Sequence, residues 1–492
     1  MINIPKCMST QHPDNVSTPP YAEDGVLKGE GEVQEAVDVY GLGCDEQMWD
    51  SEGKDVDRLV VSKLLSGYPD FFSKHRLGTD RFLTMRVPNP SIERGMSKML
   101  LESLESIPSA WDVAQEFYGD VNAPPIFEII LPFTTSAEEL NRLYYYYTKY
   151  VVGKGDMPLY GDYKVSDWVG EVNPRTIGVI PLIEDLDHMV IADEIVGEFL
   201  KDKDFAFQRV FLARSDPALN YGVISAELMI RIALQRLQNL QTRIGTPLYP
   251  IIGAGSSPFR GNLKPINLER AFREYPSAHT LTVQSAFKYD YDLEIVKAGI
   301  TKIRDHLASE PISIDEKRAL RIIEKYSTEY RRCLRSLTPV LSKMIGLIPR
   351  RRERKLHIGL FGYSRSLEPD EEGEEAIRLP RAIEFCAILY SLGIPPELLG
   401  LAAMDSEDLA YVKEVYPSFE EDLADSLKFA NEKSISRHMG KEYVALASRF
   451  SQDVNRVHEG LTTAIRSSLD TLPPSYISRY VVEAARLRKF LG

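Results

Sequence analysis

The chain of 492 residues has few cysteines and no long hydrophobic run. Its four cysteines form no Cys-x-x-Cys pair and stand far apart, which favours free thiols in a reducing compartment over a disulfide framework. No stretch of about 18 apolar residues occurs, so we expect no transmembrane helix. The N-terminal segment also lacks the basic-flanked apolar core of a signal peptide. We therefore expect a cytoplasmic protein with no membrane partner.

A basic stripe is also missing from the sequence. The net charge is −13, and no long run of lysine and arginine offsets it, which argues against a nucleic-acid partner. Charged residues make up 27% of the chain and are scattered, as on a solvated globular surface. An anionic substrate would need a local positive pocket against this background.

The apolar residues gather in short runs that predict buried β-strands. A helical pattern over residues 222–243 separates two of these runs, and runs between 176 and 284 recur every 30 to 40 residues or so, as βαβ units require. Residues 291–355 and the part after Pro380 are typical of helices. We predict one α/β domain over 1–492, a (β/α)8 TIM-type barrel with extensive additional helices. The predicted strand segments are 3–13, 81–90, 125–136, 176–185, 208–217, 248–258, 278–286 and 356–365.

Two carboxylates follow successive strands of this predicted barrel. Glu184 comes after the strand in 176–185, and Asp216 after the strand in 208–217. Adjacent strands lie about 4.8 Å apart, so the two side chains can share one cation. Mg²⁺ suits such a pair because it keeps several waters. The alternative is that each carboxylate caps the following helix or pairs with an arginine.

Three arginines, Arg86, Arg214 and Arg260, also follow predicted strands. Guanidinium groups bind carboxylate and phosphate, so together they would make an anion pocket, although single arginines more often form surface ion pairs. Residues 253–261, GAGSSPFRG, can bring backbone N–H groups to an oxyanion, or can form a plain tight turn. His12, at the end of the first predicted strand, is suited to proton transfer or to a structural role.

These motifs, in this order, resemble those of phosphoenolpyruvate carboxylase, and most closely its short, archaeal-type branch. The resemblance extends over nearly the whole chain. It is carried by MSTQHPDN, RFLTMR, VIPLIEDL, LARSDPALNYG, PIIGAGSSPFRG, LTVQ and RLPRAIEFCAILYSLGIPPELLG.

The resemblance implies a carboxy-lyase that converts phosphoenolpyruvate and bicarbonate to oxaloacetate and phosphate, an anaplerotic fixation of CO2. Carboxyphosphate and a metal-bound pyruvate enolate are the implied intermediates, Mg²⁺ or Mn²⁺ the implied cofactor, and a homotetramer the implied assembly. Glu184 and Asp216 would bind the metal. His12, Arg86 and Arg260 would be catalytic, and the substrate would contact Gly253, Gly255, Ser256, Gln284 and Arg381.

The sequence departs from the long enzymes of this family at the phosphate site. Ile252 and Ala254 stand where those enzymes carry a histidine and an arginine, and Leu219 stands where they carry a lysine. Arg214 is the candidate replacement for these charges, and we therefore count it with His12, Arg86 and Arg260 among the predicted catalytic residues. Two other functions remain open from the residues alone: a metal-dependent aldolase or lyase acting on a pyruvate enolate, and a non-catalytic scaffold with an anion pocket.

Overall fold

A closed barrel of parallel strands forms the centre of the molecule. The computed structural model describes residues 3–51, 57–120, 123–353, 366–367, 377–451 and 453–492. Among these residues, eight strands close the barrel in the order β1-β10-β9-β8-β7-β4-β3-β2. Their bounds are β1 Cys7–Ser9, β2 Glu46–Asp50, β3 Phe82–Arg86, β4 Glu128–Leu131, β7 Gly178–Ile183, β8 Gln208–Ala213, β9 Leu248–Gly253 and β10 Thr280–Val283.

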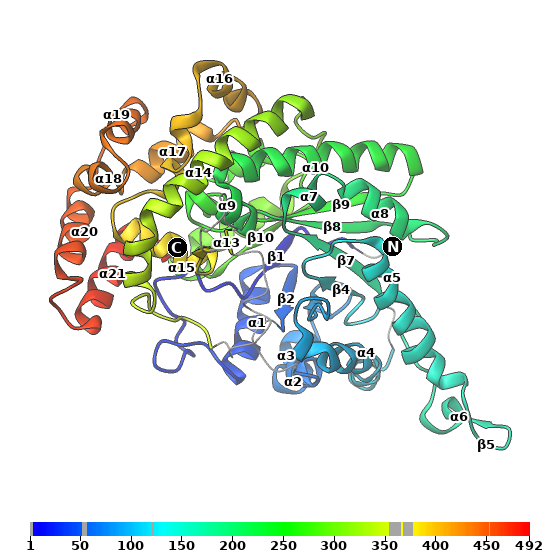
Figure 1. Ribbon diagram of the computed structural model, residues 1–492. Coiled ribbons are helices and arrows are strands. Elements are labelled where there is room, and N and C mark those ends of the chain that lie inside the picture. Colours follow the sequence, from blue (N-terminus) through cyan, green and yellow to red (C-terminus); the bar gives the residue numbers. More distant parts are fainter. Residues whose placement is uncertain (1–2, 52–56, 121–122, 354–365, 368–376, 452) are drawn as a thin grey trace.

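Helices surround this barrel and extend well beyond it (Figure 1). The first half of the chain contains α1 Glu30–Leu42, α2 Val60–Gly67, α3 Pro69–Phe72, α4 Ser97–Tyr118, α5 Ala137–Tyr145, α6 Val165–Val169, α7 Leu186–Met189, α8 Ala192–Leu200, α9 Ser215–Tyr221 and α10 Val223–Ile244. The second half contains α11 Leu268–Glu274, α12 Ser285–Tyr289, α13 Leu293–Asp305, α14 Glu316–Met344, α15 Ala382–Ser391, α16 Ser406–Val415, α17 Phe419–Leu427, α18 Glu432–His438, α19 Lys441–Phe450, α20 Arg456–Ser468 and α21 Pro474–Arg488.

Two small antiparallel sheets of two strands each lie outside the barrel. One pairs β5 Pro158–Tyr160 with β6 Tyr163–Lys164, and the other pairs β11 Ser366–Leu367 with β12 Ile377–Arg378. The predicted helix over 222–243 is confirmed as α10, which is buried along most of its length. Within the described residues, no single helix is both long and apolar enough to cross a membrane; α15 and the segment Pro396–Ala403, bent by 97°, meet those criteria only as a pair.

The prediction of the barrel is confirmed, but one of its strands was not foreseen. Seven predicted segments each contain a barrel strand, whereas the eighth, 356–365, lies outside the described residues. The barrel closes instead through β2, whose sequence is EQMWD. This strand is polar because Glu46 and Asp50 face charged partners inside the barrel, so it lacks the β-branched, apolar composition typical of a buried strand.

Side chains of alternate residues fill the barrel in layers, as the two-residue period of a strand requires. The layer nearest the start of the strands is ionic: Arg209 donates to Glu46 at 2.7 Å and to Glu128 at 3.1 Å. The next layer is apolar, and consists of Met8, Met48, Ile130, Ile180, Leu182, Phe211, Ala213 and Ile251. In β2, the inward-facing residues are Glu46, Met48 and Asp50, so Asp50 lies at the carboxyl ends of the strands.

The ionic layer makes the stability of the barrel depend on pH. Burial raises the pKa of Glu128 to about 7; Arg209 opposes this shift and Glu46 adds to it. A carboxyl whose pKa is raised by folding binds protons more tightly in the folded state, so stability falls as the pH rises from its unfolded pKa towards the folded one.

We therefore expect the free energy of unfolding to fall between pH 5 and pH 7 in the native chain, and to fall less in Glu128→Gln, which cannot ionise. Denaturant unfolding across this pH range measures the difference, with the exposed Glu138→Gln as control. Parallel pH profiles for the native chain and Glu128→Gln would contradict the assignment.

Candidate active site

Polar side chains gather where the barrel strands end, and Asp14 joins several of them. Asp14 follows β1 and is fully buried. Its Oδ1 accepts a hydrogen bond from the backbone N–H of Ala286 at 2.7 Å, and its Oδ2 accepts from the N–H of Ser256 at 3.2 Å. Oδ2 also lies 3.3 Å from the guanidinium of Arg260. One carboxylate therefore connects the ends of β1, β9 and β10.

The guanidinium of Arg260 makes hydrogen bonds to several groups of the site. Its Nε donates to the hydroxyl of Ser215 at 3.0 Å, and another nitrogen donates to the side chain of Gln284. Gly255 lies directly against it: a Cβ there would lie 2.8 Å from the guanidinium carbon, so a larger residue would displace the guanidinium. Arg260, Gly255, Ser256 and Gln284 were all predicted site residues, and the structure brings them together.

The last residue of the sequence, Gly492, also reaches this cluster. Its carbonyl accepts from Arg260 at 2.9 Å, and the neighbouring Leu491 donates its N–H to the carbonyl of Asp14 at 2.6 Å. A Cβ on Gly492 would meet the carbonyl of Ile383 at 1.9 Å. The segment is thus held between the loop after β9 and helix α15, at whose start the predicted residue Arg381 lies.

The two predicted metal ligands lie at the ends of neighbouring strands. Glu184 directly follows β7 and is buried, and its Oε2 accepts from the N–H of Phe133 at 2.9 Å. Asp216 lies in the first turn of α9, after β8, and β7 pairs with β8 in parallel. Asp216 is the neighbour of Ser215, which binds Arg260. The carboxylates and the Arg260 cluster therefore share one end of the barrel.

His12 and Arg86 complete this end of the barrel. The Nδ1 atom of His12 lies 2.8 Å from the hydroxyl oxygen of Thr10. The backbone carbonyl of His12 accepts a hydrogen bond from the N–H of Ser285, just after β10. Arg86 is the last residue of β3, and its Nε donates to Asp50 at 2.8 Å. Gly253 is the last residue of β9 and is half-buried.

Arg214 differs from the other predicted residues. Its side chain is wholly enclosed, donating to the hydroxyl of Tyr275 at 3.1 Å and to the carbonyl of Phe259 at 3.0 Å. Its Nε also lies 3.1 Å from Glu227. These contacts tie Arg214 to the glycine-rich loop, while its Nη2 makes no hydrogen bond within the described structure. Its predicted contact with substrate stays a prediction.

Three further charged residues were missed by the sequence reasoning: Asp14, Asp50 and Lys288. The buried ammonium of Lys288 donates to the carbonyl of Thr10 at 3.1 Å and to Glu35 at 3.1 Å, which fixes the loop that carries His12. Burial alone would raise the pKa of Glu35, but Arg352 and Lys288 hold it well below its usual range. The alternation of inward-facing residues along β2 could have indicated Asp50. No feature of the local sequence indicates Asp14 or Lys288.

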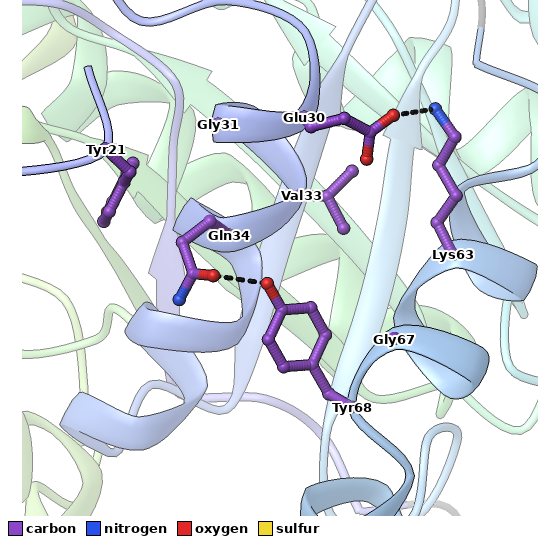
Figure 2. Close-up of a pocket in the computed structure, with 8 residues that line it drawn as sticks. All are labelled: Tyr21, Glu30, Gly31, Val33, Gln34, Lys63, Gly67 and Tyr68. Atoms are coloured by element: carbon purple, nitrogen blue, oxygen red, sulfur yellow. Dashed lines mark hydrogen bonds and ion pairs between the residues drawn. The ribbon is translucent and has the colours of Figure 1, made fainter. Parts of the chain in front are cut away.

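Figure 2 shows a surface cavity of about 430 Å³ that lies elsewhere, between α1 and α2 on the outside of the barrel. Lys63 pairs with Glu30 across its rim at 2.8 Å, and Tyr68 donates to Gln34. None of the predicted site residues lines it. The candidate site is therefore the carboxyl end of the barrel rather than this cavity.

Comparison with known proteins identifies the family. The family model described as phosphoenolpyruvate carboxylase matches residues 4–492. The chain belongs to the phosphoenolpyruvate carboxylase family. Proteins named phosphoenolpyruvate carboxylase from Methanothermobacter thermautotrophicus, Halobacterium salinarum and Pyrococcus abyssi are 48%, 44% and 43% identical to it, over 100%, 100% and 99% of this chain and all of each relative.

The similar solved structures are more distant. An HpcH/HpaI aldolase from Desulfitobacterium hafniense is 14% identical, with a TM-score of 0.34 over 62% of this chain and 95% of that one. The citrate synthase SbnG is 10% identical, with a TM-score of 0.33 over 57% of this chain and 86% of that one. Membership of the phosphoenolpyruvate carboxylase family therefore rests on the sequence comparisons.

The position of Asp14 in this family member predicts a large effect on stability. Asp14→Asn removes the charge beside the buried Arg260 guanidinium and turns an acceptor into a donor that faces a backbone N–H. Because breaking a buried pair leaves one charge uncompensated, we expect the free energy of unfolding to fall by about 3 kcal/mol. Denaturant titration measures it, and the exposed Asp292→Asn serves as control. A change no larger than that of the control would show that Asp14 does not organise the site.

Proposed function

We propose that this chain carboxylates phosphoenolpyruvate with bicarbonate, giving oxaloacetate and phosphate. The observation that carries the proposal is the grouping of Glu184, Asp216, Arg86, Arg260 and His12 at one end of the barrel, in a chain of the family that bears this name. The substrate has a carboxylate and a phosphate. A molecule with these two anionic groups requires cationic groups, which this end of an acidic protein supplies.

The donor set at Glu184 and Asp216 fits Mg²⁺ or Mn²⁺. No group of three or more His, Cys, Asp or Glu side chains with metal-binding geometry occurs in the described part of the chain. A cation here would therefore take two carboxylates from the protein and its other ligands from water and substrate, which is the arrangement that Mg²⁺ favours. When bound, it would supply Lewis-acid stabilisation for charge on the substrate oxygens.

The arginines and the loop after β9 would bind the phosphate. Arg260 is already oriented by Asp14, Ser215 and Gln284, so it loses little freedom when substrate arrives. The hydroxyl of Ser256 is buried and makes no hydrogen bond within the described structure, which is expected of a group that awaits a ligand. Gly253 and Gly255 let the backbone approach the phosphate, and Arg86 and Arg381 would complete the anion site.

The proposed reaction begins with transfer of the phosphoryl group to bicarbonate. Arg86 and Arg260 stabilise the charge that develops during this step. The products are carboxyphosphate and the enolate of pyruvate. His12 then accepts the proton of carboxyphosphate, whose bond between carbon and the phosphate oxygen breaks to give CO2 and inorganic phosphate. The enolate carbon attacks this CO2, and the new C–C bond gives oxaloacetate. Burial of the surrounding side chains keeps water from protonating the enolate. We place the reaction in the cytoplasm and propose a homotetramer as the assembly.

Measuring oxaloacetate and phosphate together tests the function. We expect both products to form from phosphoenolpyruvate only when bicarbonate and Mg²⁺ or Mn²⁺ are present. Glu184→Gln should lower the rate by at least about a hundredfold, since a cation that orients the substrate loses a ligand. Turnover without bicarbonate would instead indicate an aldolase or lyase, and binding without phosphate release would indicate a scaffold.

His12→Asn separates the two halves of the proposed reaction. We expect the rate of oxaloacetate formation to fall by about a hundredfold or more, the usual contribution of a general base. Phosphate release that depends on bicarbonate should fall less, because the histidine acts after phosphoryl transfer. His306→Asn is the control, since the carbonyl of His306 binds Lys6 at the opposite end of β1. Oxaloacetate formation at the native rate would exclude the role of His12.

A further inference from the structure

An arm of the chain projects away from the barrel and carries exposed aromatic side chains. The arm, defined here as residues 145–169, continues α5 through a π-helical turn over Tyr146–Val151 and ends in the β5–β6 hairpin and α6. Figure 1 shows it running from α5 outward to β5 and α6, past the outer helices. Both hairpin strands are exposed along their whole length, and α6 buries none of its residues.

The composition of the arm differs from that of the remaining surface. Eight of the twenty large apolar side chains that are exposed in the described structure fall within these 25 residues. Tyr160 is 87% exposed and Trp168 is 70% exposed, and Leu159 and Val169 accompany them. Tyrosine and tryptophan are enriched in protein interfaces, so a segment that exposes this many apolar side chains is a candidate interface.

The exposed area matches what a stable interface needs. With about 200 Å² for each aromatic side chain, the five exposed aromatics of the arm present roughly 600 Å². The neighbouring Met157, Leu159 and Val169 add to this area. A standard interface buries about 800 Å² on each partner, so the arm alone supplies most of one side.

The charge of the arm indicates which partner fits it. Its three lysines balance its three aspartates, so the arm is neutral although the whole chain has a net charge of −13. Two copies of an acidic protein repel each other over most of their surfaces, and least where the surface is neutral and apolar. In a two-fold symmetric dimer, the same surface of each copy contacts its counterpart on the other copy. A neutral surface can do so without repulsion between like charges.

We propose that the arm is an interface through which two copies of this chain associate. The aromatic side chains at its tip pack against the second copy and leave the solvent when the dimer forms. In a larger assembly, the arm provides one of its interfaces. The proposal concerns assembly alone and does not depend on the reaction proposed above.

Light scattering coupled to size-exclusion chromatography tests the proposal on the full chain. We expect the native protein to elute at twice the chain mass of 55.7 kDa or at a larger multiple. Tyr160→Glu and Trp168→Glu should each at least halve that mass, or raise the dissociation constant about tenfold or more, because each places a charge in an apolar contact. Leu307→Glu, at a position 78% exposed and outside the arm, should leave the mass unchanged.

Two results would overturn the proposal: a native protein that stays at the mass of one chain at every concentration, or arm variants that keep the native mass. Circular dichroism establishes that the variants fold, and the replacement of Tyr160, which is 87% exposed, removes little packing within one chain. Activity measured on the same samples separates this inference from the proposed function. An active monomer would exclude the interface and the proposed homotetramer but not the reaction, and an inactive dimer would exclude only the carboxylase.

Discussion

The candidate site depends on one buried carboxylate, that of Asp14. Burial raises its pKa, and the guanidinium of Arg260 counteracts this effect. The ion pair between them, and the two backbone N–H groups that Asp14 accepts from, tie the loops after three strands into one unit. The segment that ends at Gly492 binds both members of the pair. Orientation of Arg260 therefore depends on chain segments that are far apart in the sequence.

The layers inside the barrel explain why functional groups lie at only one end. Because side chains alternate along each strand, the ionic layer of Arg209, Glu46 and Glu128 lies at one end of the barrel and an apolar layer lies in its middle. The strands then end in charged residues, with Arg86 completing β3 and Glu184 following β7. A dry middle layer separates the two charged layers. The site thus has a low-dielectric floor, which strengthens electrostatic interactions with a bound anion.

Much of this arrangement could be predicted from the sequence, because apolar runs end where the site begins. His12, Glu184, Asp216 and Arg260 were placed at strand ends by that reasoning, and the structure has them there. β2 escaped prediction because its polar residues satisfy partners inside the barrel.

The remaining features could not be predicted because they depend on contacts between distant residues. No feature of the local sequence distinguishes Asp14 from a surface aspartate. Arg214 follows a strand as Arg260 does, yet its side chain turns to Tyr275 and Glu227. The carbonyl of Gly492 reaches Arg260 across 232 residues of sequence. Contacts of this range are decided by the packing of helices around the barrel rather than by local pattern.

We propose, above all, that Glu184 and Asp216 hold one divalent cation beside an anion site formed by Arg86 and Arg260. Anomalous diffraction from crystals grown with Mn²⁺ and phosphoenolpyruvate measures the position of the metal directly. The account predicts one manganese peak within bonding distance of both carboxylates, with the phosphate next to Arg260. A peak bound to other residues, or no peak at this end of the barrel, would contradict it.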